Sequence, residues 1–182
     1  LTIKAKTEGA RNGHLRLSLY RCSGSEQITT QTHPLGTPII DERGRYRDHL
    51  DLTIEVPNID PWSAETPRLY RLCATLLDAE SQPLETEAYF IGFRSVEIIN
   101  GLLCINGKPL TIRGVNKHEH DPLLGHSENL AAVEHDIRLM KQHNFNAIRC
   151  AHYPHQVGFY DLCDQLGMYV VDEANIETHG VI

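Results

Sequence analysis

Three groups of residues that can carry charge, donate hydrogen bonds or bind metal lie in the second half of the chain. They span residues 116–121, 149–155 and 172–179, and eight of the eleven histidines lie between His118 and His179. Side chains of these types do general acid–base work, hold metal ions or bind the hydroxyl groups of a sugar. We therefore expect the chemistry of this protein to be concentrated in its second half.

The spacing of residues within these groups limits which kinds of site they can form. His118 and His120 would share one face of an extended segment, with Glu119 opposite. Neither this segment nor the pair His152 and His155 matches His-Glu-x-x-His or another specific zinc signature. The sequence also has no Gly-x-Ser-x-Gly elbow and no phosphate-binding Gly-rich loop. Glycoside hydrolysis remains open, because it needs only carboxylates and partners for hydroxyl groups.

Each group follows a predicted buried strand, and segments with helical periodicity lie between the strands. The strand candidates are residues 110–115, 145–150 and 168–171, and the helix candidates are 129–143, with Ser127 as N-cap, and 157–166, ended by Gly167. This β-α-β-α-β order indicates either a small open sheet or the beginning of a (β/α)8 TIM barrel. Because ligands bind beyond the carboxyl ends of parallel strands, we expect the three groups to converge there.

Residues 1–112 have a different pattern, in which apolar and polar residues alternate in short segments separated by turn residues. The clearest segments are 14–20, 50–56, 69–77, 86–93, 95–99 and 102–105. Such strands are typical of an antiparallel β-sandwich. Trp62 and Tyr70 are predicted to be core residues of this part, although aromatic rings of this kind also stack on sugars. The sequence thus predicts two domains, residues 1–112 and 113–182.

Composition excludes several classes of function. With 17 Lys and Arg against 24 Asp and Glu, the net charge of −7 argues against unspecific binding to nucleic acid or to anionic membranes. No apolar stretch approaches the length of a transmembrane helix, and no signal peptide opens the chain. The five scattered cysteines predict reduced thiols and a cytoplasmic location. Because the first strand candidate begins at Leu1 without a Met, we expect an excised piece of a longer protein.

Several of these segments together resemble glycoside hydrolase family 2, and within it most resemble the large bacterial β-galactosidases. The resemblance is carried by residues 113–120 (RGVNKHEH), 145–154 (FNAIRCAHYP) and 172–180 (DEANIETHG), and in the first half by 39–44 (IIDERG) and 62–70 (WSAETPRLY). It implies a truncated immunoglobulin-like β-sandwich over residues 1–112, followed by the start of a TIM-barrel catalytic domain. It covers the chain in order from one end to the other.

The resemblance also implies an activity, the retaining hydrolysis of terminal β-D-galactosides such as lactose by two glutamates. In the family the acid/base lies in an Asn-Glu pair after the fourth barrel strand and the nucleophile lies further on, so neither is expected within this chain. His152 matches the family histidine that binds the galactosyl group and stabilises its transition state. Arg149 is expected to point into the barrel and hold a carboxylate ionised, or else to form a plain core ion pair. The remaining candidates for substrate binding or for support of the site are Asn116, His118, Asp172, Glu173, Asn175 and His179.

Further expectations concern cofactors and partners. By resemblance the full-length enzyme uses Mg²⁺ and Na⁺, with ligands outside this segment, so that no metal is bound by the residues of this chain. It is expected to be a homotetramer in which the loop 41–48 reaches a neighbouring subunit, although a solvated surface loop is the simpler interpretation. The alternatives are a β-glucuronidase or β-mannosidase of the same family, or a non-catalytic sandwich module that binds carbohydrate or protein. The coding sequence beyond Ile182 would separate enzyme from module.

Overall fold

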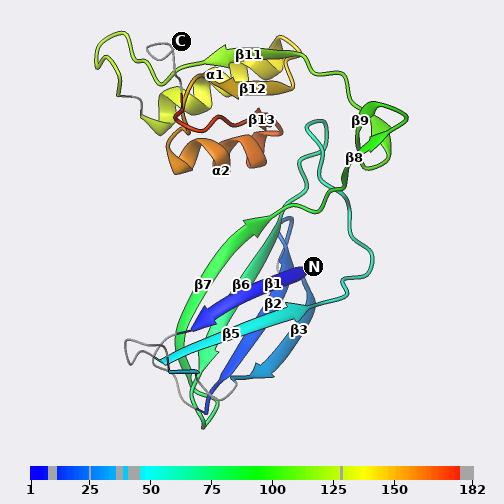
Figure 1. Ribbon diagram of the computed structural model, residues 1–182, viewed down its shortest axis with the longest axis vertical. Coiled ribbons are helices and arrows are strands. Elements are labelled where there is room, and N and C mark those ends of the chain that lie inside the picture. The colour runs from blue at the N-terminus through cyan, green and yellow to red at the C-terminus, as the bar shows by residue number, and fades with distance from the viewer. Residues whose placement is uncertain (8–11, 25, 36–38, 41–45, 128, 177–182) are drawn as a thin grey trace. The chain divides into compact units, whose positions relative to one another are not determined.

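The structure is a computed structural model, which describes residues 1–7, 12–24, 26–35, 39–40, 46–127 and 129–176 (Figure 1). The chain divides into two compact units. The first comprises Leu1–Ile59 and Tyr70–Ile91, and the second Asp60–Leu69 and Gly92–Ile182. Each unit has its own sheets and its own buried core.

The first unit is an antiparallel β-sandwich. In the described residues one sheet has the order β3-β2-β6-β7, and the other has the order β1-β5-β4. The strands are β1 (Thr2–Thr7), β2 (His14–Arg21), β3 (Gln27–Pro34), β4 (Ile39–Ile40), β5 (Tyr46–Thr53), β6 (Tyr70–Leu77) and β7 (Pro83–Ile91). The sandwich predicted from the alternating pattern is therefore present.

The alternation of β2 explains the core of this unit. Leu15, Leu17 and Leu19 are buried at every second position, so they point to the same face of the sheet. Opposite Leu19 on the neighbouring strand lies Leu72, which is also buried. The inner faces leave a cavity of about 400 Å³ whose lining is mainly aliphatic. Lys4, Glu85 and Glu87 also line it, but none of the candidate site residues from the sequence does.

The second unit begins with the segment 60–69 and a small sheet of order β10-β9-β8. Its strands are β8 (Val96–Ile99), β9 (Leu102–Ile105) and β10 (Lys108–Pro109). Trp62 is buried, and its indole Nε1 donates a hydrogen bond of 2.8 Å to the carbonyl of Asp164 in α2. The Arg94 guanidinium lies 4.9 Å above the indole ring. Trp62 and Tyr70 are thus both buried, but only Tyr70 belongs to the sandwich as expected, whereas Trp62 belongs to the core of the second unit.

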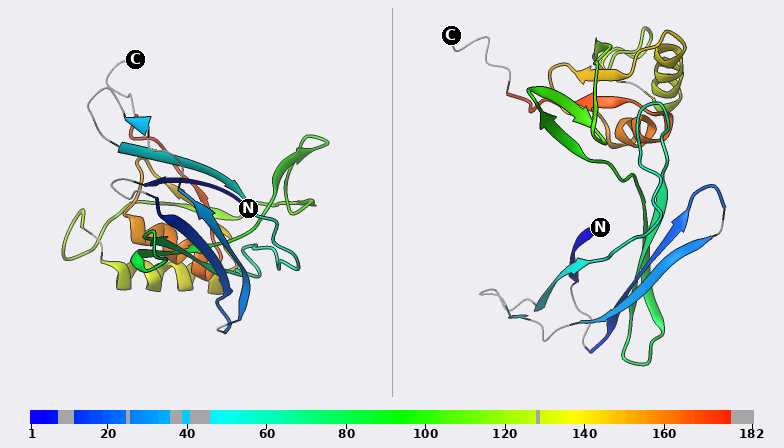
Figure 2. Two further views of the ribbon diagram at one scale, coloured as in Figure 1. Left: turned by 90° about the horizontal axis from the view of Figure 1, so that it is seen from below. Right: turned by 90° about the vertical axis from the view of Figure 1, so that its right-hand side faces the viewer.

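The remainder of the second unit is a parallel β/α arrangement. The elements are β11 (Gly114–Lys117), α1 (Leu130–Gln142), β12 (Ala147–Cys150), α2 (Val157–Leu166) and β13 (Tyr169–Val171). The strands pair in parallel in the order β11-β12-β13. Both helices pack on one face of this sheet (Figure 2), through a core that is fully closed to solvent. That core consists of Val133, Ile137, Ile148, Cys150, Phe159, Cys163 and Met168.

Two of the boundaries that differ from those expected have a visible cause in the structure. The N-cap of α1 is Asn129, not Ser127, because the Asn129 side chain accepts a 2.9 Å hydrogen bond from the amide of Ala132. The first parallel strand, expected over residues 110–115, begins at Gly114. The reason is that the Asn146 side chain bonds the backbone on both sides of Ile112, accepting from the amide of Arg113 and donating to the carbonyl of Thr111. Those residues therefore do not join the strand ladder.

The boundary expected between residues 112 and 113 concerns folding domains and stays a prediction. Residues 92–112 cluster in the structure with the second unit. The segment 60–69 joins the same unit, since the Lys141 ammonium donates to the carbonyls of both Ala64 and Gly167. The second packing unit therefore includes segments from both sides of residue 112.

Candidate functional site

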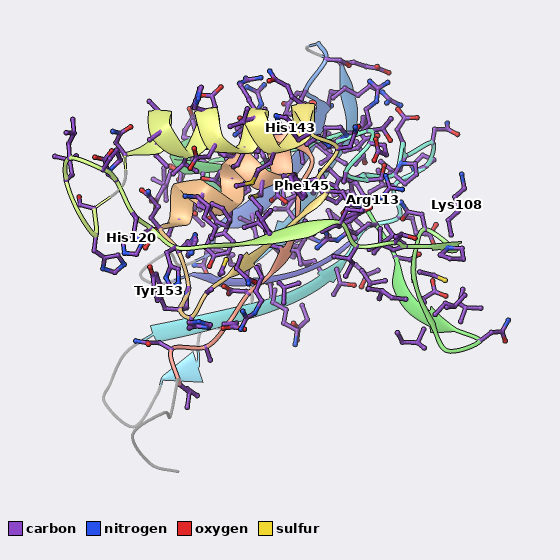
Figure 3. All side chains as sticks on the ribbon, turned by 90° about the horizontal axis from the view of Figure 1, so that it is seen from above. Lys108, Arg113, His120, His143, Phe145 and Tyr153 are labelled. Carbon is purple, nitrogen blue, oxygen red and sulfur yellow. The ribbon has the colours of Figure 1, made fainter. Side chains whose placement is uncertain are left out.

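The candidate site lies at the carboxyl ends of the three parallel strands. Figure 3 shows His120 and Tyr153 at the carboxyl end of β11 and Arg113 at its amino end. Arg149 occupies β12, His152 follows that strand, and Glu173 follows β13. Because the strands are parallel and adjacent, their following loops come together at this edge of the sheet.

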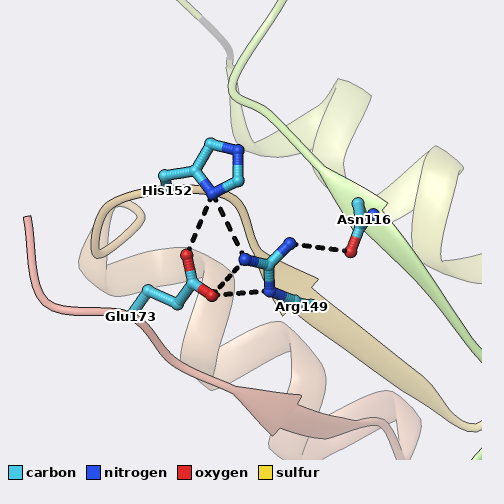
Figure 4. Close-up of polar contacts among 4 residues, drawn as sticks. All are labelled: Asn116, Arg149, His152 and Glu173. Carbon is cyan, nitrogen blue, oxygen red and sulfur yellow. Dashed lines mark hydrogen bonds and ion pairs between the residues drawn. The ribbon is translucent and has the colours of Figure 1, made fainter. Parts of the chain in front are cut away.

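Arg149 is the centre of this cluster (Figure 4). Its guanidinium binds the Glu173 carboxylate in a fork, with Nε 2.5 Å from Oε1 and Nη2 contacting the same oxygen. Asn116 is the register partner of Arg149 on β11, so both side chains project from one face of the sheet. Arg149 Nη1 donates to Asn116 Oδ1 at 3.3 Å. Arg149 thereby links β11 and the segment that follows β13, on the face of the sheet opposite the helices.

His152 completes the cluster through its Nδ1 atom. This atom lies 3.1 Å from Glu173 Oε2 and 3.3 Å from Arg149 Nη2. One ring nitrogen cannot serve both neighbours at once, because it donates only when protonated and accepts only when not. A carboxylate partner favours the proton on Nδ1, as it does for many carboxylate-bound histidines. In the neutral ring Nε2 is then the acceptor, and Figure 4 shows it facing away from Glu173.

Glu173 is held in its ionised form. Partial desolvation works to raise its pKa, but hydrogen bonds from His152 and Arg149 and the guanidinium charge outweigh it. The net effect is that the pKa of Glu173 lies below its ordinary value. The side chains of Arg149 and Glu173 are 37% and 26% exposed to solvent, so the cluster remains accessible to a ligand.

Asp172 points away from this cluster, toward the helices. The Tyr160 hydroxyl of α2 donates to Asp172 Oδ1 at 2.8 Å and accepts from the amide of His155 at 2.9 Å. Neighbouring residues of an extended segment point to opposite sides, which separates Asp172 from Glu173. Burial, and next the negative charge of Asp172, raise the pKa of the Cys150 thiol to about 11. Cys150 is therefore a neutral packing residue rather than a nucleophile.

The other candidates are placed as follows. His118 is exposed, and its ring centroid lies 5.6 Å from that of His152 in an edge-to-face arrangement. Asn175 lies exposed in a bend after β13. His179 and residues 41–45 of the loop 41–48 lie outside the described residues. The structure thus brings together Asn116, Arg149, His152 and Glu173, with His118 beside them.

Several residues near the site carried no signal of their own in the sequence. Tyr153, in the loop after β12, contacts the loop after β11, where His126 Nε2 lies 2.7 Å from its hydroxyl. Glu119 accepts from the amide of Gln156 at 2.8 Å, and Lys117 is buried and paired with Asp136. The only sequence signal for Tyr153 and Lys117 was their place directly after predicted strands. A tyrosine or lysine there is too common to be selected without tertiary contacts.

The described residues show neither a cluster of metal ligands nor a membrane-spanning helix. In that part of the chain no three His, Cys, Asp or Glu side chains gather as a metal would require. The Mg²⁺ and Na⁺ ligands expected outside this segment stay a prediction. No helix of the described chain is long and apolar enough to cross a membrane.

The arrangement suits the recognition of a hydroxylated ligand. It offers a fixed carboxylate, a guanidinium and an imidazole on one accessible face. Each of these groups forms directional hydrogen bonds, and the ion pair keeps its members in place before a ligand arrives.

Comparison with known proteins gives matches along the whole chain. The family model described as "Glycosyl hydrolases family 2" matches residues 1–94, and "Glycosyl hydrolases family 2, TIM barrel domain" matches residues 96–182. A β-galactosidase of Aeromonas hydrophila subsp. hydrophila is 51% identical over 98% of this chain, and one of Pectobacterium atrosepticum is 53% identical over 94%. The chain covers 18% and 16% of the length of these two relatives.

Solved structures agree with these matches. A β-glucuronidase of Bacteroides uniformis is 26% identical, with a TM-score of 0.80 over 96% of this chain and 21% of its own. A glycosyl hydrolase family 2 member from Bacteroides cellulosilyticus is also 26% identical, with a TM-score of 0.77 over 94% and 21%. The fold therefore comprises a sandwich domain of this type and the start of a TIM barrel domain.

Proposed function

The chain belongs to glycoside hydrolase family 2, and from this membership we propose that it is a segment of a retaining β-galactosidase acting on terminal β-D-galactosides such as lactose. The observation that carries the proposal is identity of 51% and 53% to β-galactosidases over nearly the whole chain. Identity to the β-glucuronidase of Bacteroides uniformis is only 26%. The residues around the predicted site are included in these matches.

We also propose the finer fold that membership implies. The sandwich is immunoglobulin-like, and the β11-α1-β12-α2-β13 segment continues, in the complete polypeptide, into a closed (β/α)8 barrel. In this arrangement the carboxyl ends of β11, β12 and β13 face the active site, as in TIM-barrel enzymes generally. The acid/base and nucleophile glutamates then come from later barrel strands.

Within that active site we assign His152 to the galactosyl group. Its Nδ1 atom lies 3.1 Å from Glu173 Oε2, a contact that fixes the orientation of the ring for a hydrogen bond with a sugar hydroxyl. A hydrogen bond that tightens as the oxocarbenium-like transition state forms would lower the barrier. The negative charge of Glu173 also stabilises any positive charge that develops on the imidazole.

Arg149 has a supporting role in this proposal. Its fork holds Glu173 ionised, and Glu173 in turn orients His152. Asn116 and His118 lie on the accessible side and are assigned to substrate binding. Asp172 acts through its bond to Tyr160, by fixing the turn after β13. Asn175 and His179 complete the pocket wall in this assignment.

The remaining assignments extend to the complete protein. We propose a cytoplasmic homotetramer in which loop 41–48 reaches a subunit interface, and a Mg²⁺ and Na⁺ requirement met by residues outside this chain. A β-glucuronidase is the second candidate, because the chain superposes on one with a TM-score of 0.80. A β-mannosidase and a non-catalytic sandwich module are the other possibilities.

The test is a comparison of substrates with the complete polypeptide. The purified protein is assayed with the p-nitrophenyl β-D-galactoside, β-D-glucuronide and β-D-mannoside, and the anomer released first is identified by NMR. We expect the galactoside to have the highest kcat/KM and the β-anomer to appear first, because retention follows from double displacement. Preference for the glucuronide or mannoside, or inversion, would make the proposal wrong. No turnover of any glycoside would favour the module.

A further inference from the structure

The loops that follow β11 and β12 are connected by hydrogen bonds of one tyrosine. Tyr153, in the loop after β12, receives a 3.1 Å hydrogen bond on its hydroxyl from the amide of Glu119, in the loop after β11. The same hydroxyl is 2.7 Å from His126 Nε2 at the far end of the Glu119 loop. In return, Glu119 Oε1 accepts a 2.8 Å hydrogen bond from the amide of Gln156, the N-cap of α2.

The hydroxyl of Tyr153 can satisfy both partners at once. A tyrosine hydroxyl has one proton to donate and can accept through its oxygen. It accepts from the Glu119 amide, which can only donate, and donates to His126 when Nε2 carries no proton. Removal of this one oxygen therefore breaks both connections while leaving the ring in place.

The peptide between His118 and Glu119 is held at both of its polar atoms. Its N–H is the group that donates to Tyr153, and its carbonyl accepts from Lys117 Nζ at 3.3 Å. Lys117 is only 7% exposed and is anchored on α1 by an ion pair of 3.2 Å with Asp136. This peptide is thus fixed between α1 on one side and the loop after β12 on the other.

The orientation of His118 depends on that peptide. His118 lies immediately before it, and its ring is placed 5.6 Å from His152 and 6.0 Å from Tyr153. His118 is exposed, so packing by itself does not determine where its ring points. Its ring also lies 5.3 Å from that of His120, and the hydrogen bonds on either side of the peptide limit the position of its backbone.

We propose that Tyr153 is a positioning residue, whose hydroxyl fixes the His118–Glu119 peptide and so keeps the imidazoles of His118 and His152 side by side toward the sugar. The inference rests on the proposed function for its consequence in catalysis. It adds a residue that touches no substrate but acts through His118. A small misplacement of a binding group is enough to lower the rate of an enzyme substantially.

The experiment uses Tyr153→Phe in the complete polypeptide, with Tyr169→Phe as the matched control. Tyr169 opens β13 at the amino end of the strands, where its hydroxyl accepts from the amide of Ala64 at 3.4 Å. We expect Tyr153→Phe to speed hydrogen exchange in the peptide that contains Glu119 and to lower kcat for a β-galactoside about tenfold. In a His118→Ala background it should cause no further loss of kcat, because both changes remove the same contribution. Tyr169→Phe should change neither measurement.

The two readouts separate the inference from the proposed function. If the unaltered protein hydrolyses no β-galactoside, the proposed function is wrong, while hydrogen exchange still decides whether Tyr153 fixes the Glu119 amide. If Tyr153→Phe leaves that exchange unchanged, the inference is wrong. Faster exchange with unchanged kcat, or a full loss of rate in the His118→Ala background, would equally overturn the positioning role.

Discussion

At the scale of single residues, the feature that organises the site is the branched contact of Arg149, Glu173 and His152. The guanidinium and the imidazole converge on one carboxylate from two directions. Such an arrangement restricts the rotamers of all three side chains, because each contact depends on the other two. The cluster is therefore organised before a ligand binds.

This arrangement predicts a rate effect for His152→Ala in the complete enzyme. Loss of a hydrogen bond that tightens in the transition state should lower kcat about 10²- to 10³-fold with a smaller change in KM. His143→Ala, at the exposed C-cap of α1, is the control and should leave both constants unchanged. Steady-state kinetics with a chromogenic β-galactoside checks the result. A near-normal kcat with a raised KM would instead make His152 a ground-state binder.

The pKa of Glu173 gives a second prediction at this scale. In the folded chain Glu173 should titrate below its ordinary value of 4.5, and His152→Ala should raise its pKa by removing one hydrogen bond. Because the pKa is lowered on folding, the associated stabilisation is complete above pH 4.5 and is lost as the pH falls through the lowered value. Carbon-13 NMR of labelled glutamate carboxyls measures this, with Glu173→Gln for assignment. Titration at or above 4.5 would contradict the contacts described here.

At the scale of elements, the ends of the helices limit the conformations of the loops that form the site. The N-cap of α1 follows the loop that carries His118 and His126, so a defined helix start also limits that loop. Asn129→Ala removes the hydrogen bond to the amide of Ala132 and should lower the free energy of unfolding by about 1 kcal/mol. Ser127→Ala is the matched control and should change it by less than about 0.5 kcal/mol. Urea unfolding followed by circular dichroism distinguishes the two, and equal losses would contradict the assignment of the cap.

The end of α2 gives a second prediction for an element. Gly167 has a φ of +81°, and a Cβ there would lie 2.3 Å from the carbonyl oxygen of Ala64. Gly101 has a similar φ of +78° but nothing within 4 Å of such a Cβ. Gly101→Ala should therefore cost about 1 kcal/mol for the backbone conformation alone, and Gly167→Ala clearly more. The same unfolding experiment measures both variants, and equal costs would show that the contact with Ala64 relaxes freely.

At the scale of the whole molecule, the described site contains supporting groups but no pair of carboxylates placed for double displacement. Asp172 is bonded to Tyr160, Glu119 to Gln156, and Glu173 to Arg149 and His152. Each of these carboxylates is thus engaged in holding the structure of the site.

We therefore predict that the 182-residue chain on its own does not hydrolyse a chromogenic β-galactoside. The physical reason is that none of its described groups is placed to protonate the leaving group or attack the anomeric carbon. The assay compares the purified chain with buffer and with the complete polypeptide. Turnover that survives purification and is abolished by Glu119→Gln, Asp172→Asn or Glu173→Gln would contradict this prediction.

The strands and helices around the site could be predicted because their periodicity is local. Apolar residues at every second position identified β2 and β6, and spacing of three to four residues identified α1 and α2. The strand β3 was not predicted, since its sequence QITTQTHP has no continuous apolar alternation. It pairs with β2 in the sheet, so backbone hydrogen bonds to β2 stabilise this strand although its own sequence shows no strand pattern.

The sequence by itself determined the class of fold, the family and the edge of the sheet at which the polar groups meet. These depend on short motifs and on the order of strands and helices, and both can be read along the chain. It did not distinguish Glu173 from Asp172, or show what Tyr153 contacts. Only the tertiary structure decided these, because one residue of register turns a side chain from the helices to the open face. Contacts such as that of Tyr153 with Glu119 join residues 34 positions apart. Distances of this kind are set when the strands pair, and no local pattern encodes them.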